Sequence, residues 1–181
     1  MIIVFVLAVA LAAAGALFDW RTGHIPNKLT HGAIGIAPIL HLGLKAWAER
    51  GFTTNVWIEG GLSIVGILFC GLVPWLMFWK NAIGAGDVKL LAGIGGLLGP
   101  MLGMEAELYS FIAACLIAPA FLAYEGKLLP TMKNALFLLL NPFLKKERRR
   151  EASPQLMSWF RMGPSIFIGT LLACAFARAP Q

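Results

Sequence analysis

The chain has 181 residues, of which 59% are hydrophobic and only 13% are charged, and its mean hydropathy is +0.76. Soluble domains carry about 25% charged residues, so this composition excludes an ordinary soluble protein and indicates an integral membrane protein. The net charge of +6 does not indicate nucleic acid binding, because basic residues in so apolar a chain usually set its orientation in the membrane.

Six continuous apolar stretches predict six transmembrane helices, and their continuity favours helices over the alternating strands of a β-barrel. The stretches cover residues 1–18 and about 31–48, 58–79, 90–104, 108–124 and 163–177. The fourth and sixth are shorter than the about 20 residues that a span usually needs. We therefore expect an all-α integral membrane protein, a polytopic bundle of about six transmembrane helices that forms one domain over residues 1–181.

The basic residues predict the orientation of this bundle. The first stretch begins with "MIIVFV", which lacks the positively charged start of a secretory signal, so we expect a retained helix. With the N-terminus outside, the cytoplasmic segments hold twelve Lys and Arg residues and the outer segments only Lys45, Arg50 and Arg178. This excess on the inner side follows the positive-inside rule, and it places Asp19 and Asp87 together on the cytoplasmic side.

Residues 128–161 form the longest stretch that is not expected to cross the membrane. Its apolar part, "NALFLLLNPFL", is too short to span, and the following "KKERRR" suits anionic lipid headgroups. We expect a basic cytoplasmic or interfacial segment here, between the last two spans.

An acidic residue ends the first apolar stretch, in "LFDWRTGHIPNKLT". A carboxylate at a membrane edge needs a partner or access to water, so the position of Asp19 predicts a specific role. Pro26 holds Ile25 away from helical geometry and, with Asn27, indicates a defined turn or a helix start. Pairing with Arg21 or capping of a helix is the structural alternative.

A second isolated acid, Asp87, lies in "IGAGDVKLLAGIGG", beside Gly84 and Gly86. The glycines permit close approach of another segment, and the acid suits the positive end of the following helix, so capping is again the alternative. No phosphate-binding loop pattern is present. Further along, glycines spaced by four residues predict one smooth helix face for tight packing; they are Gly95, Gly99 and Gly103.

Two carboxylates at one depth predict an acid–base pair, provided that folding brings Asp19 and Asp87 together. One carboxyl would keep its proton and polarise a carbonyl, while the other would stay charged and take a proton from water. Such a pair hydrolyses a peptide bond without a metal or a cofactor. The histidines form no ligand pattern, and the three cysteines lie singly in apolar stretches, where buried inert thiols are expected; the latter are Cys70, Cys115 and Cys174.

Both acidic stretches resemble the signatures of the type IV prepilin peptidases, which are G-x-G-D intramembrane aspartyl proteases. The D-x-R-x-x-x-I-P-N signature is matched by Asp19, Arg21, Ile25, Pro26 and Asn27. The G-x-G-D-x-K signature is matched by Gly84, Gly86, Asp87 and Lys89, and "RMGPSIFIG" looks like the start of the family's final helix.

The resemblance implies a function, a location and a site. Asp19 and Asp87 would be catalytic; Arg21, Pro26, Asn27, Gly84, Gly86 and Lys89 would support the site or position the substrate. The implied substrates are prepilin-like membrane proteins, which lose a short basic leader, usually after glycine, at the cytoplasmic face of the inner membrane. Since no paired C-x-x-C motifs are present, we expect the short form of tight-adherence (Flp) pilus systems, without the N-terminal methyltransferase region.

Three alternatives remain open from the sequence. An archaeal preflagellin peptidase shares the same core. A small proton-coupled transporter or channel component would use intramembrane acids as relays, and it predicts acids deep within the spans. A structural assembly subunit would keep its function when both aspartates are replaced by asparagine.

Overall fold

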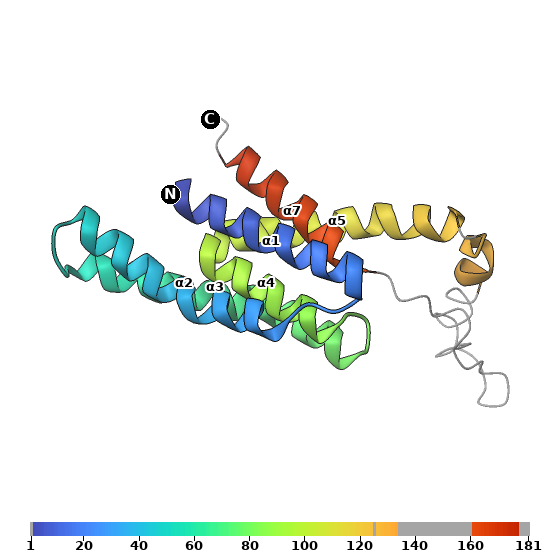
Figure 1. Cartoon of the computed structure of the whole chain (residues 1–181), viewed down its shortest axis with the longest axis horizontal. Coiled ribbons are helices and arrows are strands. Elements are labelled where there is room, and N and C mark those ends of the chain that lie inside the picture. The colour runs from blue at the N-terminus through green and yellow to red at the C-terminus, as the bar shows by residue number, and fades with distance from the viewer. Residues whose placement is uncertain (1, 125, 134–160, 178–181) are drawn as a thin grey trace, which may run out of the picture. The chain divides into compact units, whose positions relative to one another are not determined.

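The computed structural model describes residues 2–124, 126–133 and 161–177. They are helical apart from short connections (Figure 1). The helices are α1 (Ile2–Thr22), α2 (Asn27–Ala48), α3 (Thr54–Trp79), α4 (Ala85–Leu98), α5 (Pro100–Tyr124) and α7 (Gly163–Phe176). The chain divides into two compact units, the first formed by residues 1–114 with 161–181 and the second by residues 115–160.

The all-helical membrane class is confirmed. Helices α1, α3 and α5 are long and apolar enough to cross a membrane, and α7 is a shorter apolar helix. Each predicted stretch corresponds to one helix, but the predicted end of the fourth stretch, at about residue 104, is wrong. The chain breaks at Gly99, so α4 ends at Leu98 and α5 begins at Pro100, instead of one helix continuing to residue 104.

Helix α4 lies at the centre of the first unit, where it packs against α3, α2 and α1. All eight residues from Leu90 to Leu97 are buried. A helix that is covered on every side must be apolar on every side, which explains why this segment carries no charge after Lys89. The position of α4 is therefore determined by three neighbours at once.

The glycines spaced by four residues do not form the one face of a single helix that the sequence predicts. Gly99 has a φ of 77°, a conformation that side chains disfavour, and it reverses the chain instead of continuing the helix. A Cβ on Gly103 would lie 2.8 Å from the Cα of Gly95, so these two glycines face each other across α4 and α5. A Cβ on Gly66 of α3 would lie only 2.1 Å from the carbonyl oxygen of Gly95. Three helices thus meet at backbone distance.

The C-terminal end of α4 is buried, so its last carbonyl groups need partners from elsewhere. Ser63 of α3 donates its hydroxyl to the Gly96 carbonyl at 2.7 Å. The Nε2 of His41 on α2 lies 2.8 Å from the Leu97 carbonyl, and because a carbonyl only accepts, this nitrogen carries the proton. Two neighbouring helices therefore complete the end of a short helix.

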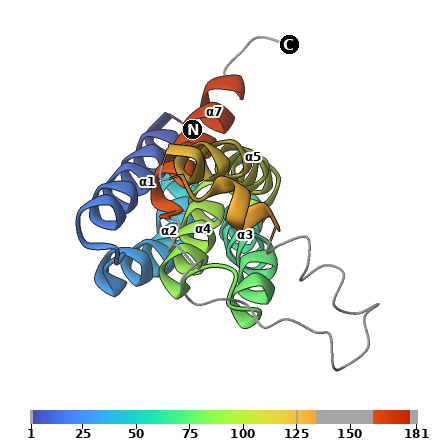
Figure 2. The same ribbon diagram turned by 90° about the vertical axis from the view of Figure 1, so that its right-hand side faces the viewer.

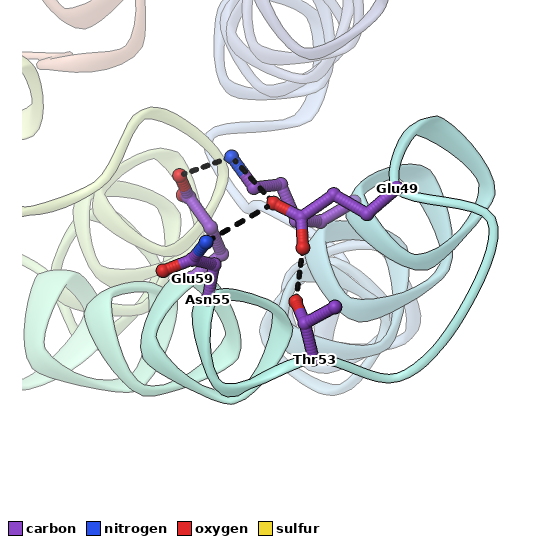
Figure 3. Close-up of polar contacts among 5 residues, drawn as sticks. Glu49, Thr53, Asn55 and Glu59 are labelled. Carbon is purple, nitrogen blue, oxygen red and sulfur yellow. Dashed lines mark hydrogen bonds and ion pairs between the residues drawn. The ribbon is translucent and has the colours of Figure 1, made fainter.

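The connection between α2 and α3 is closed by a polar network (Figure 3). The hydroxyl of Thr53 and the amide of Asn55 both donate to Glu49, and Lys45 lies 3.5 Å from Glu49 and 3.7 Å from Glu59. The hydrogen bond from Thr53, with the charge of Lys45, holds the pKa of Glu49 below its usual range. The network fixes the turn at the end of the bundle opposite the α3–α4 connection (Figure 1).

Two predictions on other segments have different outcomes. Most of the predicted interfacial segment, residues 134–160, lies outside the described residues, so it stays a prediction. Cys70 and Cys174 are buried as expected, whereas Cys115 is exposed on α5, so the prediction of a buried thiol is wrong there.

The contact between Gly66 and Gly95 predicts a strong response to one methyl group. Gly66→Ala should lower the free energy of unfolding by at least about 2 kcal/mol, because neither backbone can move without disturbing α4. The matched control is Gly43→Ala on α2, where an added Cβ meets nothing within 4 Å, and the change should stay within about 1 kcal/mol. Equal melting temperatures of the two variants in detergent would contradict the described contact.

Candidate active site

Helix α1 ends in a defined turn that leaves Asp19 in its last helical turn. The backbone N–H of Gly23 bonds to the Asp19 carbonyl at 2.9 Å, and Gly23 has a φ of 66°, the usual geometry of a glycine after a helix. The hydroxyl of Thr22 donates to the Phe18 carbonyl at 2.8 Å. The Asp19 side chain is only 7% exposed, so it faces protein and not solvent.

The Ile-Pro-Asn element joins this turn to the second signature. Ile25 is 3% exposed, and a Cβ on Gly86 would lie 3.1 Å from the Cβ of Ile25, so glycine lets the two segments touch. Pro26 has an extended ψ of 130° and stands at the N-cap position of α2, so a helix starts here as the sequence predicts. Lys89 donates to the side-chain oxygen of Asn27 at 2.8 Å. The two signatures therefore form one folded unit.

Asp87 lies in the first turn of α4, where it is partly buried. Its Oδ2 accepts the backbone N–H of Gly84 at 3.3 Å. The capping alternative is thus observed, but this contact leaves the second carboxyl oxygen for another partner.

The register of α1 against α4 brings the two acids to the same level. A Cβ on Gly93 would lie 3.4 Å from Leu11 Cδ2, and a Cβ on Gly15 would lie 2.6 Å from Leu90 Cδ2. As α1 advances by about one turn, α4 goes back by about one turn, so the helices run antiparallel. Asp19 lies one further turn along α1 from Gly15, so it lies opposite the beginning of α4, which carries Asp87. Figure 2 looks onto this end of the bundle.

The beginning of α7 completes the surroundings of Asp19. The backbone N–H of Gly163 donates to Asp19 Oδ2 at 2.8 Å, in a buried position. Just before it, the guanidinium of Arg161 donates to the carbonyl of Trp20 at the end of α1. Sequence reasoning assigned no role to these two residues, and the only signal was the "RMGP" start of the last helix.

The two acids differ in their electrostatic surroundings. Asp87 lies ahead of the apolar part of α4 and outside the three helices that are long enough to span. Burial raises the pKa of Asp87 above its usual range, and the negative charge of Asp19 raises it further. Asp19 instead accepts a hydrogen bond from the backbone N–H of Gly163, in the first turn of α7. The two carboxyl groups therefore lie in unlike environments.

The structure does not bring every predicted supporting residue to the acids. Arg21 is exposed, and within the described residues it makes no ion pair with Asp19. Lys89 is turned toward Asn27 and the start of α2. Within the same residues, no three His, Cys, Asp or Glu side chains gather as metal ligands. What lies at this end is a pair of carboxyl groups of unlike environment, an arrangement suited to acid–base chemistry.

The raised pKa of Asp87 predicts a specific pH dependence of stability. Because the folded pKa lies above the unfolded one, the stabilising contribution is complete at low pH and is lost as pH rises through the folded pKa. Asp87→Asn should abolish this loss, so the variant should melt at a higher temperature than the unchanged protein at neutral pH. The advantage should disappear in acid; an advantage independent of pH would contradict the ascribed burial.

The bond between Lys89 and Asn27 predicts energetic coupling of the two signatures. We expect Asn27→Ala and Lys89→Met to be non-additive by about 0.5–1 kcal/mol, since the bond is charged but exposed. The measurement is a double-mutant cycle of unfolding in detergent. Full additivity would show that the signatures are held together by Ile25 and Gly86 alone.

The comparisons with known proteins agree with this geometry. The model of the Type IV leader peptidase family matches residues 4–123, which include both Asp19 and Asp87. The chain is also 35% identical over 101 residues to the prepilin leader peptidase/N-methyltransferase of Escherichia coli (strain K12). That similarity covers 51% of this chain and 41% of the relative, so the chain spans less than half of the relative's length. No solved structure matches.

The family match extends over the segment that holds both signatures and most of the helices around them. It agrees with the family expected from the two motifs, and it covers well over half of the 181 residues. The chain belongs to the Type IV leader peptidase family.

Proposed function

We propose that this protein is an intramembrane aspartyl endopeptidase that removes the short basic leader of type IV prepilin-like substrates. The observation that carries the proposal is the pair of unlike carboxyl groups, Asp19 and Asp87, at one end of a helical bundle. The family supports the kind of reaction, and the relative from Escherichia coli is named for prepilin leader cleavage.

The two carboxyl groups have complementary tasks in the proposed reaction. The charged member takes a proton from water, and the oxygen of that water attacks the carbonyl carbon of the scissile peptide. The neutral member donates a hydrogen bond to the carbonyl oxygen and stabilises the charge that develops there. No metal and no covalent intermediate is needed, and the proposed site includes no cofactor.

The depth of the site agrees with the proposed substrate. A prepilin-like chain has a basic leader in the cytoplasm and a hydrophobic helix in the bilayer, so its scissile bond lies near the inner membrane surface. The positive-inside count supports a position of Asp19 and Asp87 on that side. We therefore place the protein in the inner membrane as a multi-pass peptidase, with Asn27 and Lys89 fixing the turn beside the acids.

One observation favours a second candidate, a proton-coupled transporter. Glu107 lies within the apolar helix α5 and is only 6% exposed, the deep placement that a proton relay requires. Sequence reasoning did not single it out. Proton flux into vesicles that is abolished by Glu107→Gln, with no effect on leader cleavage, would establish that activity in addition to proteolysis.

The proposed roles predict the outcome of two isosteric substitutions. With a prepilin-like substrate in membranes, Asp19→Asn and Asp87→Asn should each lower cleavage by about 10³-fold or more, because neither amide can exchange the required proton. The product mass, measured by mass spectrometry, should correspond to a cut between the leader and the hydrophobic helix.

The matched control is Glu105→Gln, which removes an exposed carboxylate of α5 by the same chemical change. Cleavage by this variant should equal that of the unchanged protein. Substantial cleavage by a folded Asp19→Asn or Asp87→Asn variant would remove that residue from the proposed pair. Melting in detergent at a temperature no lower than that of the unchanged protein would show that the loss is not one of folding.

A further inference from the structure

The contact between Gly163 and Asp19 is closer than ordinary helix packing. A Cβ on Gly163 would lie 2.7 Å from Asp19 Cβ, 2.9 Å from Asp19 Oδ2 and 3.0 Å from the Cα of Ala16. The two contacts with Asp19 are shorter than real Cβ atoms show, and the Cβ of Asp19 and the Cα of Ala16 belong to stiff parts of α1. Only glycine lets the first turn of α7 approach the carboxylate.

The hydrogen bond at this contact has a clear polarity. Gly163 is the first residue of α7, so its N–H has no partner within the helix and is available to an outside acceptor. The Asp19 carboxylate accepts it at 2.8 Å, where both groups are buried. A donor at the positive end of a helix stabilises the charged form of its acceptor.

The charged neighbours of Asp19 come from the elements packed around it. Asp87 on α4 is close enough to Asp19 for two negative charges to repel each other at this end. Lys89 on α4 is engaged with Asn27, and Arg161 before α7 is engaged with the Trp20 carbonyl. Arg21 on α1 is exposed. The Gly163 N–H is thus the donor bonded to the Asp19 carboxylate itself.

We propose that Gly163 is a positioning residue whose backbone N–H selects Asp19 as the charged, water-activating member of the pair and leaves Asp87 as the proton donor. This assignment rests on the proposed peptidase function. In the first step Asp19 takes a proton from water, a C–O bond forms at the scissile carbonyl, and the carbonyl oxygen receives the proton of Asp87. In the second step the C–N bond breaks, the amine takes the proton from Asp19, and a hydroxyl of the intermediate returns a proton to Asp87.

The hydrogen bond can be tested on the full chain without any substrate. Met162 and Gly163 form the only Met-Gly pair in the sequence, so ¹³C-carbonyl methionine with ¹⁵N glycine labels one amide alone. In detergent micelles this amide proton should shift as pH is lowered, in the unchanged protein and in Asp87→Asn. In Asp19→Asn the shift should disappear. A titration that persists in Asp19→Asn, or that is absent from the unchanged protein, would overturn the proposal.

The catalytic consequence is tested with Gly163→Ala, which keeps the N–H but forces it away from Asp19. We expect kcat to fall on the order of 10²-fold with little change in KM. The acid limb of the pH–activity profile should differ from that of the unchanged protein, because the donor that the proposal assigns to Asp19 is withdrawn. If Gly163 had only a structural role, Gly163→Ala would lower the amount of folded protein and leave the acid limb of the pH–activity profile unchanged.

The matched control is Gly43→Ala on α2, where an added Cβ meets nothing within 4 Å. Its acid limb should stay where it is in the unchanged protein. A folded Gly163→Ala variant with an unchanged limb would refute the assignment, and if that variant does not fold, the amide titration decides. A titrating amide in a chain that cleaves no prepilin-like substrate would refute the peptidase and leave the hydrogen bond intact.

Discussion

The antiparallel contact of α1 with α4 is the constraint on which the site depends. Two acids separated in sequence by α2 and α3 can act together only if α1 and α4 keep one register, and small residues set that register. Gly15 makes room for Leu90, and Gly93 makes room for Leu11. A slip by a single turn would move Asp19 about 5 Å along α4 and away from Asp87. The surrounding helices serve largely to hold that register.

Much of this could be predicted from the sequence, because the signals were local. Continuous apolar runs located the helices, and the turn chemistry around Pro26 marked the start of α2. The two aspartates stood out as isolated acids at apolar edges. The spacing of Gly95, Gly99 and Gly103 predicts one helix face, because a regular repeat does not reveal that Gly99 takes a positive φ and reverses the chain. The place of Gly163 depends on a contact across 144 positions, which no local pattern encodes.

The short central helix shows how the fold accommodates a helix end inside an apolar environment. Unpaired carbonyls are costly there, and the protein answers with side chains from two neighbours, Ser63 and His41. Backbone contacts among Gly66, Gly95 and Gly103 then leave little space for water near that end. The opposite end of α4 is polar and carries Asp87. One helix therefore joins a closely packed interior to the polar end of the bundle that carries Asp87.

The bond between the first and last described helices also bears on how the protein is made. A ribosome completes α1 long before it reaches α7, so a nascent chain inserted up to α5 holds both acids but lacks the Gly163 donor. Asp19 acquires its hydrogen bond only when α7 docks beside α1. By the assignment of Gly163, the proposed peptidase therefore reaches its full rate only with the arrival of the last described helix.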